Sequence, residues 1–145
     1  MKHLVSIDDL TETDIEVLFN YADKLKNDSY IYKDSLRGKI LTNLFYEPST
    51  RTSSSFHTAM LKLGGEVLSI NEINYSSVSK GENLQDTIRT MGCYSDIIVL
   101  RSQNSGDAKL AAEVSEVPII NAGDGKGEHP TQTLLDLYTI HENFG

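Results

Sequence analysis

Four side chains that could bind a phosphate stand in a row: Ser49, Thr50, Arg51 and Thr52. They follow an apolar run, residues 39–46, and precede apolar residues at helical spacing up to residue 63. A strand that runs into a helix N-terminus presents unpaired N–H groups and the positive end of the helix dipole, which together favour a phosphate. The hydroxyls and the planar arginine fork would add donors. The simpler alternative is an ordinary N-cap, because serine and threonine are preferred there in any helix.

Two further polar groups follow predicted strands. Arg101 comes directly after the predicted strand of residues 96–100, whose apolar run from residue 97 is typical of a parallel strand covered on both faces. That is where open α/β sheets bind ligands, although an arginine there could also simply mark the exit of the strand to solvent. His129 and Gln132 open a helix after the flexible, glycine-rich loop predicted for residues 121–128. The dipole disfavours a protonated histidine there, so His129 is either a neutral donor to a substrate oxygen or a simple cap.

A polar stretch, residues 71–81, is long for a connection in a compact α/β unit and carries Ser76 and Lys80. Loops of this length are more often functional than short connections are. For Lys80 considered alone, a solvated surface lysine is the simpler interpretation.

The elements that must position these groups alternate along the chain. A first helix, predicted from residue 11 to about residue 28, carries an apolar stripe expected to serve packing. Four strands then alternate with helices, at residues 39–46, 66–70, 96–100 and 117–120. This order predicts an α/β fold, an open four-stranded parallel sheet with helices on both faces in three layers. Because all carboxyl ends of parallel strands lie at one edge, the three polar groups are expected to converge.

Composition narrows the classes of function. The 145 residues suit a single domain, and the net charge of −8 argues against nucleic acid or an acidic membrane as a partner. The one cysteine, Cys93, fits a reducing, cytoplasmic setting. We see no signal peptide, membrane span, metal-ligand cluster, Walker loop or GxGxxG motif, and we expect no metal and no cofactor.

With these motifs in place, the chain resembles the N-terminal, carbamoyl-phosphate-binding domain of aspartate carbamoyltransferase catalytic chains, a Rossmann-like fold. The resemblance rests on residues 45–52, residues 80–87, Arg101 after its strand, and residues 121–136. The sibling ornithine carbamoyltransferases share the motif of residues 49–52 but usually have lysine where Glu47 stands and arginine where Ser53 stands. Glu47 and Ser53, with residues 80–82, therefore favour the aspartate family.

The resemblance implies a role for each matching residue. Carbamoyl phosphate would be the substrate, with its phosphate held by Ser49, Thr50, Arg51 and Thr52. Its carbonyl oxygen would be surrounded by Thr52, Arg101 and His129, and its amide would be held by Gln132. The catalytic set would be Arg51, Thr52, Arg101 and His129. The reaction would transfer the carbamoyl group to the amine of L-aspartate in pyrimidine biosynthesis.

The resemblance also implies partners. Ser76 and Lys80 match residues that reach into the active site of a neighbouring subunit, so a homotrimer is expected, with a regulatory chain as a further possible partner. Family members carry a second domain that binds aspartate. We therefore expect residues 1–145 to be the carbamoyl-phosphate-binding domain with the aspartate-binding domain absent, and to have little transferase activity alone. The alternatives are a non-catalytic assembly or binding module of this fold and an ornithine-type transferase.

Overall fold

The centre of the molecule is a parallel sheet of four strands, ordered β2-β1-β3-β4. The computed structural model describes residues 2–71 and 83–144. The strands are β1 (Ile40–Phe45), β2 (Glu66–Asn71), β3 (Ile97–Ser102) and β4 (Ile119–Asp124). All three neighbouring pairs are parallel, so the carboxyl ends of the strands meet at one edge as the alternating pattern predicts.

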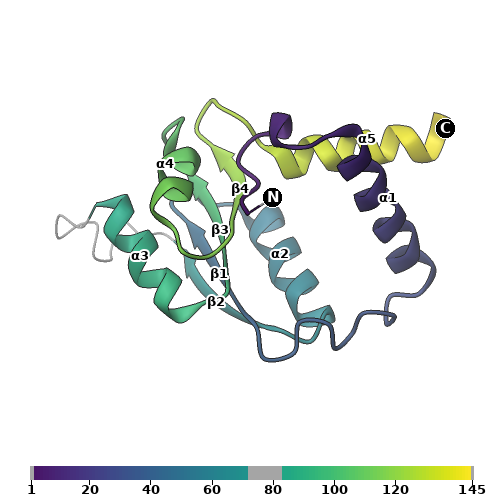
Figure 1. Cartoon of the computed structure of the whole chain (residues 1–145), viewed down its shortest axis with the longest axis horizontal. Coiled ribbons are helices and arrows are strands. Elements are labelled where there is room, and N and C mark those ends of the chain that lie inside the picture. Colours follow the sequence, from purple (N-terminus) through teal and green to yellow (C-terminus); the bar gives the residue numbers. More distant parts are fainter. Residues whose placement is uncertain (1, 72–82, 145) are drawn as a thin grey trace.

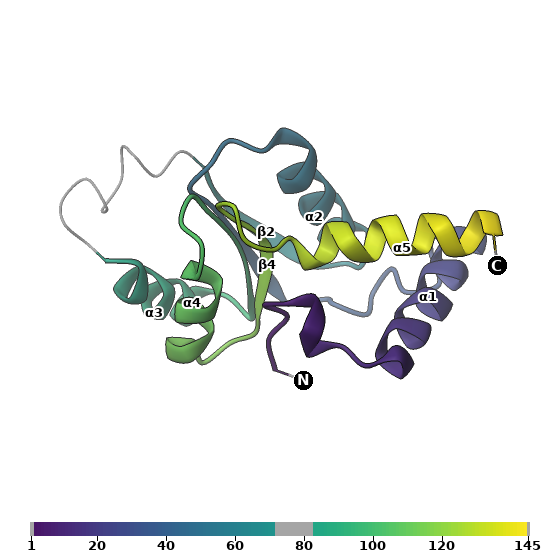
Figure 2. The same cartoon turned by 90° about the horizontal axis from the view of Figure 1, so that it is seen from above.

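Helices cover both faces of this sheet, which confirms the predicted three-layer α/β fold. The helices are α1 (Glu12–Asn27), α2 (Thr50–Lys62), α3 (Leu84–Tyr94), α4 (Asp107–Val114) and α5 (Pro130–Phe144), preceded by a short 3-10 helix, η1 (Ile7–Asp9). Figures 1 and 2 show α3 and α4 on one face and α2 on the other, while α5 starts beside β4 and runs away from the sheet. No helix in the described parts of the chain is long and apolar enough to cross a membrane.

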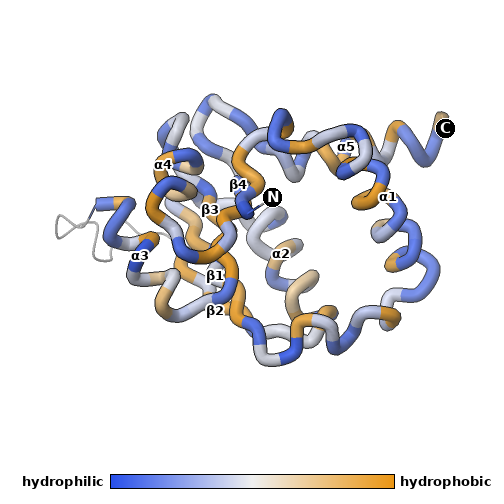
Figure 3. The backbone as a smooth tube through the Cα atoms, viewed as in Figure 1, coloured by the Kyte–Doolittle hydropathy of each residue, from blue (hydrophilic) through white to orange (hydrophobic). Residues whose placement is uncertain are grey.

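The core consists of two apolar layers because successive strand residues point to opposite faces. On one face, Leu44 and Leu100 pack with Ile88 of α3 and Ala111 of α4. On the other face, Phe45 and its neighbours pack with residues of α2. The central strands are accordingly the most apolar part of the trace in Figure 3, whereas α1 alternates between apolar and polar. This buried centre positions the ends of the strands.

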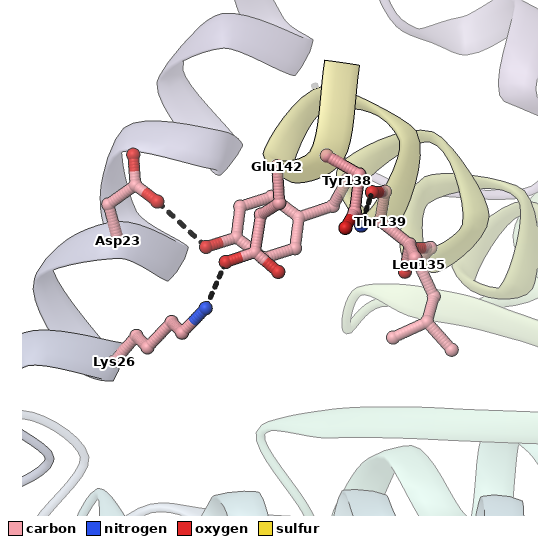
Figure 4. A network of polar contacts seen from close by, with 7 residues as sticks. Asp23, Lys26, Leu135, Tyr138, Thr139 and Glu142 are labelled. Atoms are coloured by element: carbon pink, nitrogen blue, oxygen red, sulfur yellow. Dashed lines mark hydrogen bonds and ion pairs between the residues drawn. The ribbon is translucent and has the colours of Figure 1, made fainter. Parts of the chain in front are cut away.

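Helix α1 packs, as its apolar stripe predicts, and the structure shows that its partner is α5. None of its residues is buried, and it crosses the C-terminal part of α5 at a distance from the sheet. The ring of Phe19 lies 5.3 Å from that of Tyr138, whose hydroxyl donates to Asp23 at 2.7 Å. Lys26 forms an ion pair with Glu142 (Figure 4). The amphipathic stripe therefore serves a helix pair that projects from the sheet.

β3 and β4 extend well beyond their predicted carboxyl ends, and β2 extends by a single residue. β3 continues through Arg101 and Ser102, and β4 continues through Asp124, because Ser102 still pairs with Asp124 beyond a local irregularity in the register. The first half of the predicted flexible loop, residues 121–124, is therefore strand. The sequence pattern also missed the N-terminal segment: Leu4 forms a parallel bridge with Ile120 at the free edge of β4.

Candidate active site

A cleft opens at the carboxyl ends of β1, β3 and β4. Its volume is about 590 Å³. Its lining comprises Ser49, Arg51, Thr52, Ser55, Arg101, His129, Gln132 and Leu135. Three segments far apart in the sequence thus meet at one edge of the sheet, as parallel strands require. Two of the lining side chains are arginines, so the cleft suits an anion even though the whole chain carries a net charge of −8.

The first turn of α2 forms one wall of the cleft. Ser49 is the N-cap residue, but its side chain makes no capping hydrogen bond, so the simple N-cap interpretation does not hold for it. The first-turn N–H groups therefore keep their capacity for an anion. The fully buried Asn43 of β1 donates from Nδ2 to the Ser53 carbonyl at 3.0 Å, which ties this turn to the sheet.

Arg101 reaches the cleft from the end of β3 and is held at both ends of its guanidinium. Its Nη1 donates to the Ala122 carbonyl at 3.1 Å. Its buried Nε lies 3.4 Å from Glu47 Oε2, which is an ion-pair distance rather than a hydrogen bond. Arg101 is therefore not a side chain that merely leaves the sheet for solvent, since it is fixed between the ends of β1 and β4.

His129 precedes α5 and presents a defined ring orientation. Its Nδ1 lies 3.2 Å from Thr131 Oγ1 and 3.4 Å from the Gln132 N–H, which can only donate. Nδ1 is therefore the acceptor, and the neutral ring carries its proton on Nε2. Partial burial and, secondarily, the charge of Arg101 lower the pKa of His129 below the ordinary histidine value. The imidazole is a neutral hydrogen-bond donor near pH 7.

The side-chain amide of Gln132 already forms a hydrogen bond through its nitrogen. Its Nε2 donates to Asp136 Oδ1 at 3.0 Å, one helical turn further along α5. That contact leaves Oε1 as the end that can accept a hydrogen bond from a ligand N–H. Leu135 lies three residues after Gln132 and forms an apolar part of the lining.

The structure brings together six of the residues singled out from the sequence: Ser49, Arg51, Thr52, Arg101, His129 and Gln132. Thr50 is exposed and does not belong to the lining. Ser76 and Lys80 lie outside the described residues. Sequence reasoning missed Ser55 and Leu135 as lining residues, although their helical spacing from Thr52 and Gln132 is the signal that could have found them.

The arrangement can bind an anion next to a polarised carbonyl. One wall offers hydroxyls, Arg51 and helix N–H groups, and the other offers Arg101, a neutral histidine and an amide oxygen. Donors fixed around a carbonyl oxygen stabilise the charge that develops on it during acyl transfer. Within the described ranges, no group of three or more histidine, cysteine or acidic side chains is placed to hold a metal ion.

A comparison with known protein families identifies the family to which the chain belongs. The family model described as "Aspartate/ornithine carbamoyltransferase, carbamoyl-P binding domain" matches residues 2–142. The chain belongs to this family of carbamoyl-phosphate-binding domains. The match covers the whole sheet and every residue that lines the cleft.

The named relatives point to one branch of that family. The chain is 54% identical to the aspartate carbamoyltransferase catalytic subunit of Methanocaldococcus jannaschii, over 100% of this chain and 48% of that protein. It is 50% identical to the same subunit of Clostridium perfringens, over 99% of this chain and 47% of that protein. The chain therefore spans about half the length of the curated relatives that it matches.

Solved structures agree with the sequence relatives. The catalytic subunit of the M. jannaschii aspartate transcarbamoylase superposes with a TM-score of 0.93 at 53% identity, covering 100% of this chain and 48% of that chain. Aspartate transcarbamoylase from Trypanosoma cruzi, in complex with carbamoyl phosphate and aspartate, superposes with a TM-score of 0.92 at 43% identity. There the alignment covers 99% of this chain and 48% of the other.

Proposed function

We propose that this chain is the carbamoyl-phosphate-binding half of an aspartate carbamoyltransferase, which transfers the carbamoyl group of carbamoyl phosphate to the amine of L-aspartate in pyrimidine biosynthesis. The observation that carries the proposal is the cleft, which places Arg51 at the start of α2 opposite Arg101 and His129. The names of the relatives favour aspartate over ornithine as the acceptor.

The phosphate belongs at the α2 wall. Ser49, Thr52 and Arg51 line it, and the first turn of α2 adds N–H groups and the positive end of the dipole. Thr50 would contribute through its backbone, since its side chain is outside the lining. Phosphate held in this way leaves with its charge already neutralised.

The carbamoyl group belongs at the opposite wall. Arg101, His129 Nε2 and the Thr52 hydroxyl would donate to the carbonyl oxygen, and Gln132 Oε1 would accept from the carbamoyl amide. The aspartate nitrogen attacks the carbonyl carbon, and the negative charge moves onto the carbonyl oxygen. The bond from that carbon to the bridging oxygen then breaks, and the proton that the nitrogen loses passes to the departing phosphate. Each fixed donor at the oxygen is worth about 2.7–4 kcal/mol in the barrier.

Further parts of the proposal concern the assembly. Ser76 and Lys80 are proposed to complete the site of a neighbouring subunit in a homotrimer, as the family resemblance implies, and a regulatory chain is a further proposed partner. The proposed location is the cytoplasm. A sedimentation measurement distinguishes a 16.1 kDa monomer from a trimer.

The chain by itself is expected to turn aspartate over poorly. Among the described residues, Arg51 and Arg101 are the only permanently charged cations that line the cleft, and both are assigned to carbamoyl phosphate. Within the described part of the lining, no further cation of this kind is left to orient the two carboxylates of aspartate, and orientation is a large part of such a reaction. An assay of N-carbamoyl-aspartate formation tests this expectation, and robust turnover by the 145-residue chain would contradict it.

Calorimetric titration with carbamoyl phosphate tests the binding proposal. The wild-type chain should bind, and Arg51→Ala should weaken binding by about tenfold or more, because a charge-assisted hydrogen bond to phosphate is worth about 1.5–3 kcal/mol. Lys62→Ala is the matched control, since it removes a cation from the last turn of the same helix. If the wild type and Arg51→Ala bound carbamoyl phosphate with equal affinity, Arg51 at the start of α2 would not be part of the binding site.

A further inference from the structure

Asn121 is a buried asparagine whose side chain joins three backbone segments. It lies in β4 and is 1% exposed. Its Nδ2 donates to the Val5 carbonyl at 2.8 Å and to the Glu128 carbonyl at 3.2 Å. Its Oδ1 accepts from the Gly123 N–H at 2.9 Å. Both amide protons and one oxygen lone pair are thus used on backbone groups, a role that no apolar side chain of this size can fill.

One of these segments carries His129. Glu128 directly precedes that histidine, and its peptide groups are held on both sides: its N–H donates to Asp124 Oδ1 at 3.1 Å, and its carbonyl accepts from Asn121. Its carboxylate also accepts from Ser6 Oγ and from the Ile7 N–H at 3.0 Å. The backbone that leads into His129 is therefore held in place by hydrogen bonds before α5 begins.

Another of the segments faces Arg101. Gly123 has φ +114°, and a Cβ placed there would lie 3.0 Å from Arg101 Nη1 and 3.5 Å from His129 Cδ2. The backbone of Gly123 thus lies close to the side chains of both Arg101 and His129. The hydrogen bond from Gly123 to Asn121 Oδ1 holds the residue in this position.

We propose that Asn121 is a positioning residue for His129 and Arg101, acting through the backbone of Glu128 and Gly123. The assignment rests on the proposed function for its effect on carbamoyl phosphate, but the effect on His129 is independent of any ligand. The hydrogen bonds of the Asn121 side chain go to Val5, Glu128 and Gly123, on the side of the cleft that carries Arg101 and His129, and none of those found within the described residues goes to α2. Loss of the Asn121 side chain therefore affects one half of the site.

Asn43 provides a matched control. It is an asparagine on β1 that is 0% exposed, and its Nδ2 also donates to a backbone carbonyl, but that carbonyl belongs to Ser53 at the α2 wall. Asn121→Ala and Asn43→Ala each remove a buried amide from the same sheet. General loss of stability is common to both variants, whereas loss of His129 positioning belongs to Asn121→Ala alone.

The first measurement is an NMR titration of the His129 ring nitrogens in the wild type and both variants, with His129→Gln used for assignment. In the wild type and Asn43→Ala the neutral ring should be the Nε2–H form, with the pKa below about 6.5. In Asn121→Ala the pKa should move toward that ordinary value and the two neutral forms should mix. A titration of Asn121→Ala that matches the wild type would overturn the proposal.

The second measurement is the affinity for carbamoyl phosphate and for inorganic phosphate. Asn121→Ala should raise the Kd for carbamoyl phosphate about tenfold and that for phosphate less than about twofold. An equal loss for both ligands would contradict the proposal.

If the wild type binds no carbamoyl phosphate, the proposed function fails while the His129 titration still decides the role of Asn121. If Asn121→Ala does not fold, Asn121→Ser, which cannot span Val5 and Glu128, replaces it in both measurements.

Discussion

At the scale of single residues, the site involves the backbone at Gly123 as well as the side chains that line the cleft. Gly123 adopts φ +114° and lies against both Arg101 and His129. Only glycine adopts such a conformation without strain, and here it also allows two functional side chains to approach the backbone. The sequence showed this residue as one of several glycines in an expected loop, and nothing in its spacing distinguished it from Gly125 or Gly127.

Gly123→Ala should therefore impair both stability and binding. The left-handed conformation should cost about 1–3 kcal/mol of unfolding free energy, and the new methyl group should displace Arg101. Gly38→Ala is the matched control, because Gly38 has φ +75° with nothing within 4 Å of an added Cβ. Chemical denaturation and calorimetry with carbamoyl phosphate should show that both variants lose stability and that only Gly123→Ala loses affinity. Undiminished affinity in Gly123→Ala would contradict the close approach to Arg101.

His129 should also make the stability of the fold depend on pH. Its pKa is lowered in the folded protein, by burial first and by Arg101 second, so the unfolded chain binds more protons near pH 6. The free energy of unfolding should be highest above about pH 6.5 and fall as the pH decreases through the folded pKa. The pKa of His3 is lowered as well, mainly by burial, and contributes with the same sign.

Denaturant unfolding between about pH 7.5 and pH 5.5 measures this dependence. His129→Gln should reduce the loss of stability on acidification, His3→Gln should do the same, and the double variant should have the smallest pH dependence. A pH dependence in His129→Gln equal to that of the wild type would show that the imidazole is not held in its neutral form.

At the scale of elements, the sequence predicted the strands and helices well because their apolar periodicity reflects burial on the sheet. The strand ends were less predictable. β3 and β4 extend to Ser102 and Asp124, which are polar yet buried because their side chains bind the loop backbone. Apolar periodicity carries no signal for such residues. The sequence also did not predict that α1 packs on α5, because an amphipathic stripe shows that a helix packs against something but does not identify its partner.

The pairing of α1 with α5 should depend on Tyr138. Its hydroxyl donates to Asp23, which raises the pKa of Tyr138 to about 12 (Figure 4). Helix α1 has no buried residue, and its other contacts with α5 include the Phe19 ring contacts and the ion pair between Lys26 and Glu142. Tyr138→Phe should speed amide hydrogen exchange in α1 several-fold and leave exchange in β1 and β3 unchanged.

Tyr94→Phe, which alters an exposed tyrosine on α3, is the control for that comparison. Unchanged exchange in α1 of Tyr138→Phe would mean that the Phe19 ring contacts with Tyr138 and His141 suffice to hold the helix pair.

At the scale of the whole molecule, the three polar segments found in the sequence meet because the sheet is parallel and its strands end at one edge. The net charge of −8 is no obstacle to an anionic ligand, since Arg51, Arg101 and the start of α2 concentrate positive potential in one cleft. The sequence could predict this convergence because the alternation of strands and helices along the chain implies a parallel sheet. It could not predict the supporting contacts of Asn121, Glu128 and the N-terminal segment, because hydrogen bonds between distant residues leave no periodic pattern.

The most direct test of the account is the response of the backbone amide NMR spectrum to two ligands. Carbamoyl phosphate should shift the amides of residues 49–52 together with those of residues 101, 123 and 129–132, whereas inorganic phosphate should shift mainly the first group. That result would locate the phosphate at α2 and the carbamoyl group between Arg101 and His129. Identical shifts from both ligands, or shifts confined to another part of the surface, would contradict the account.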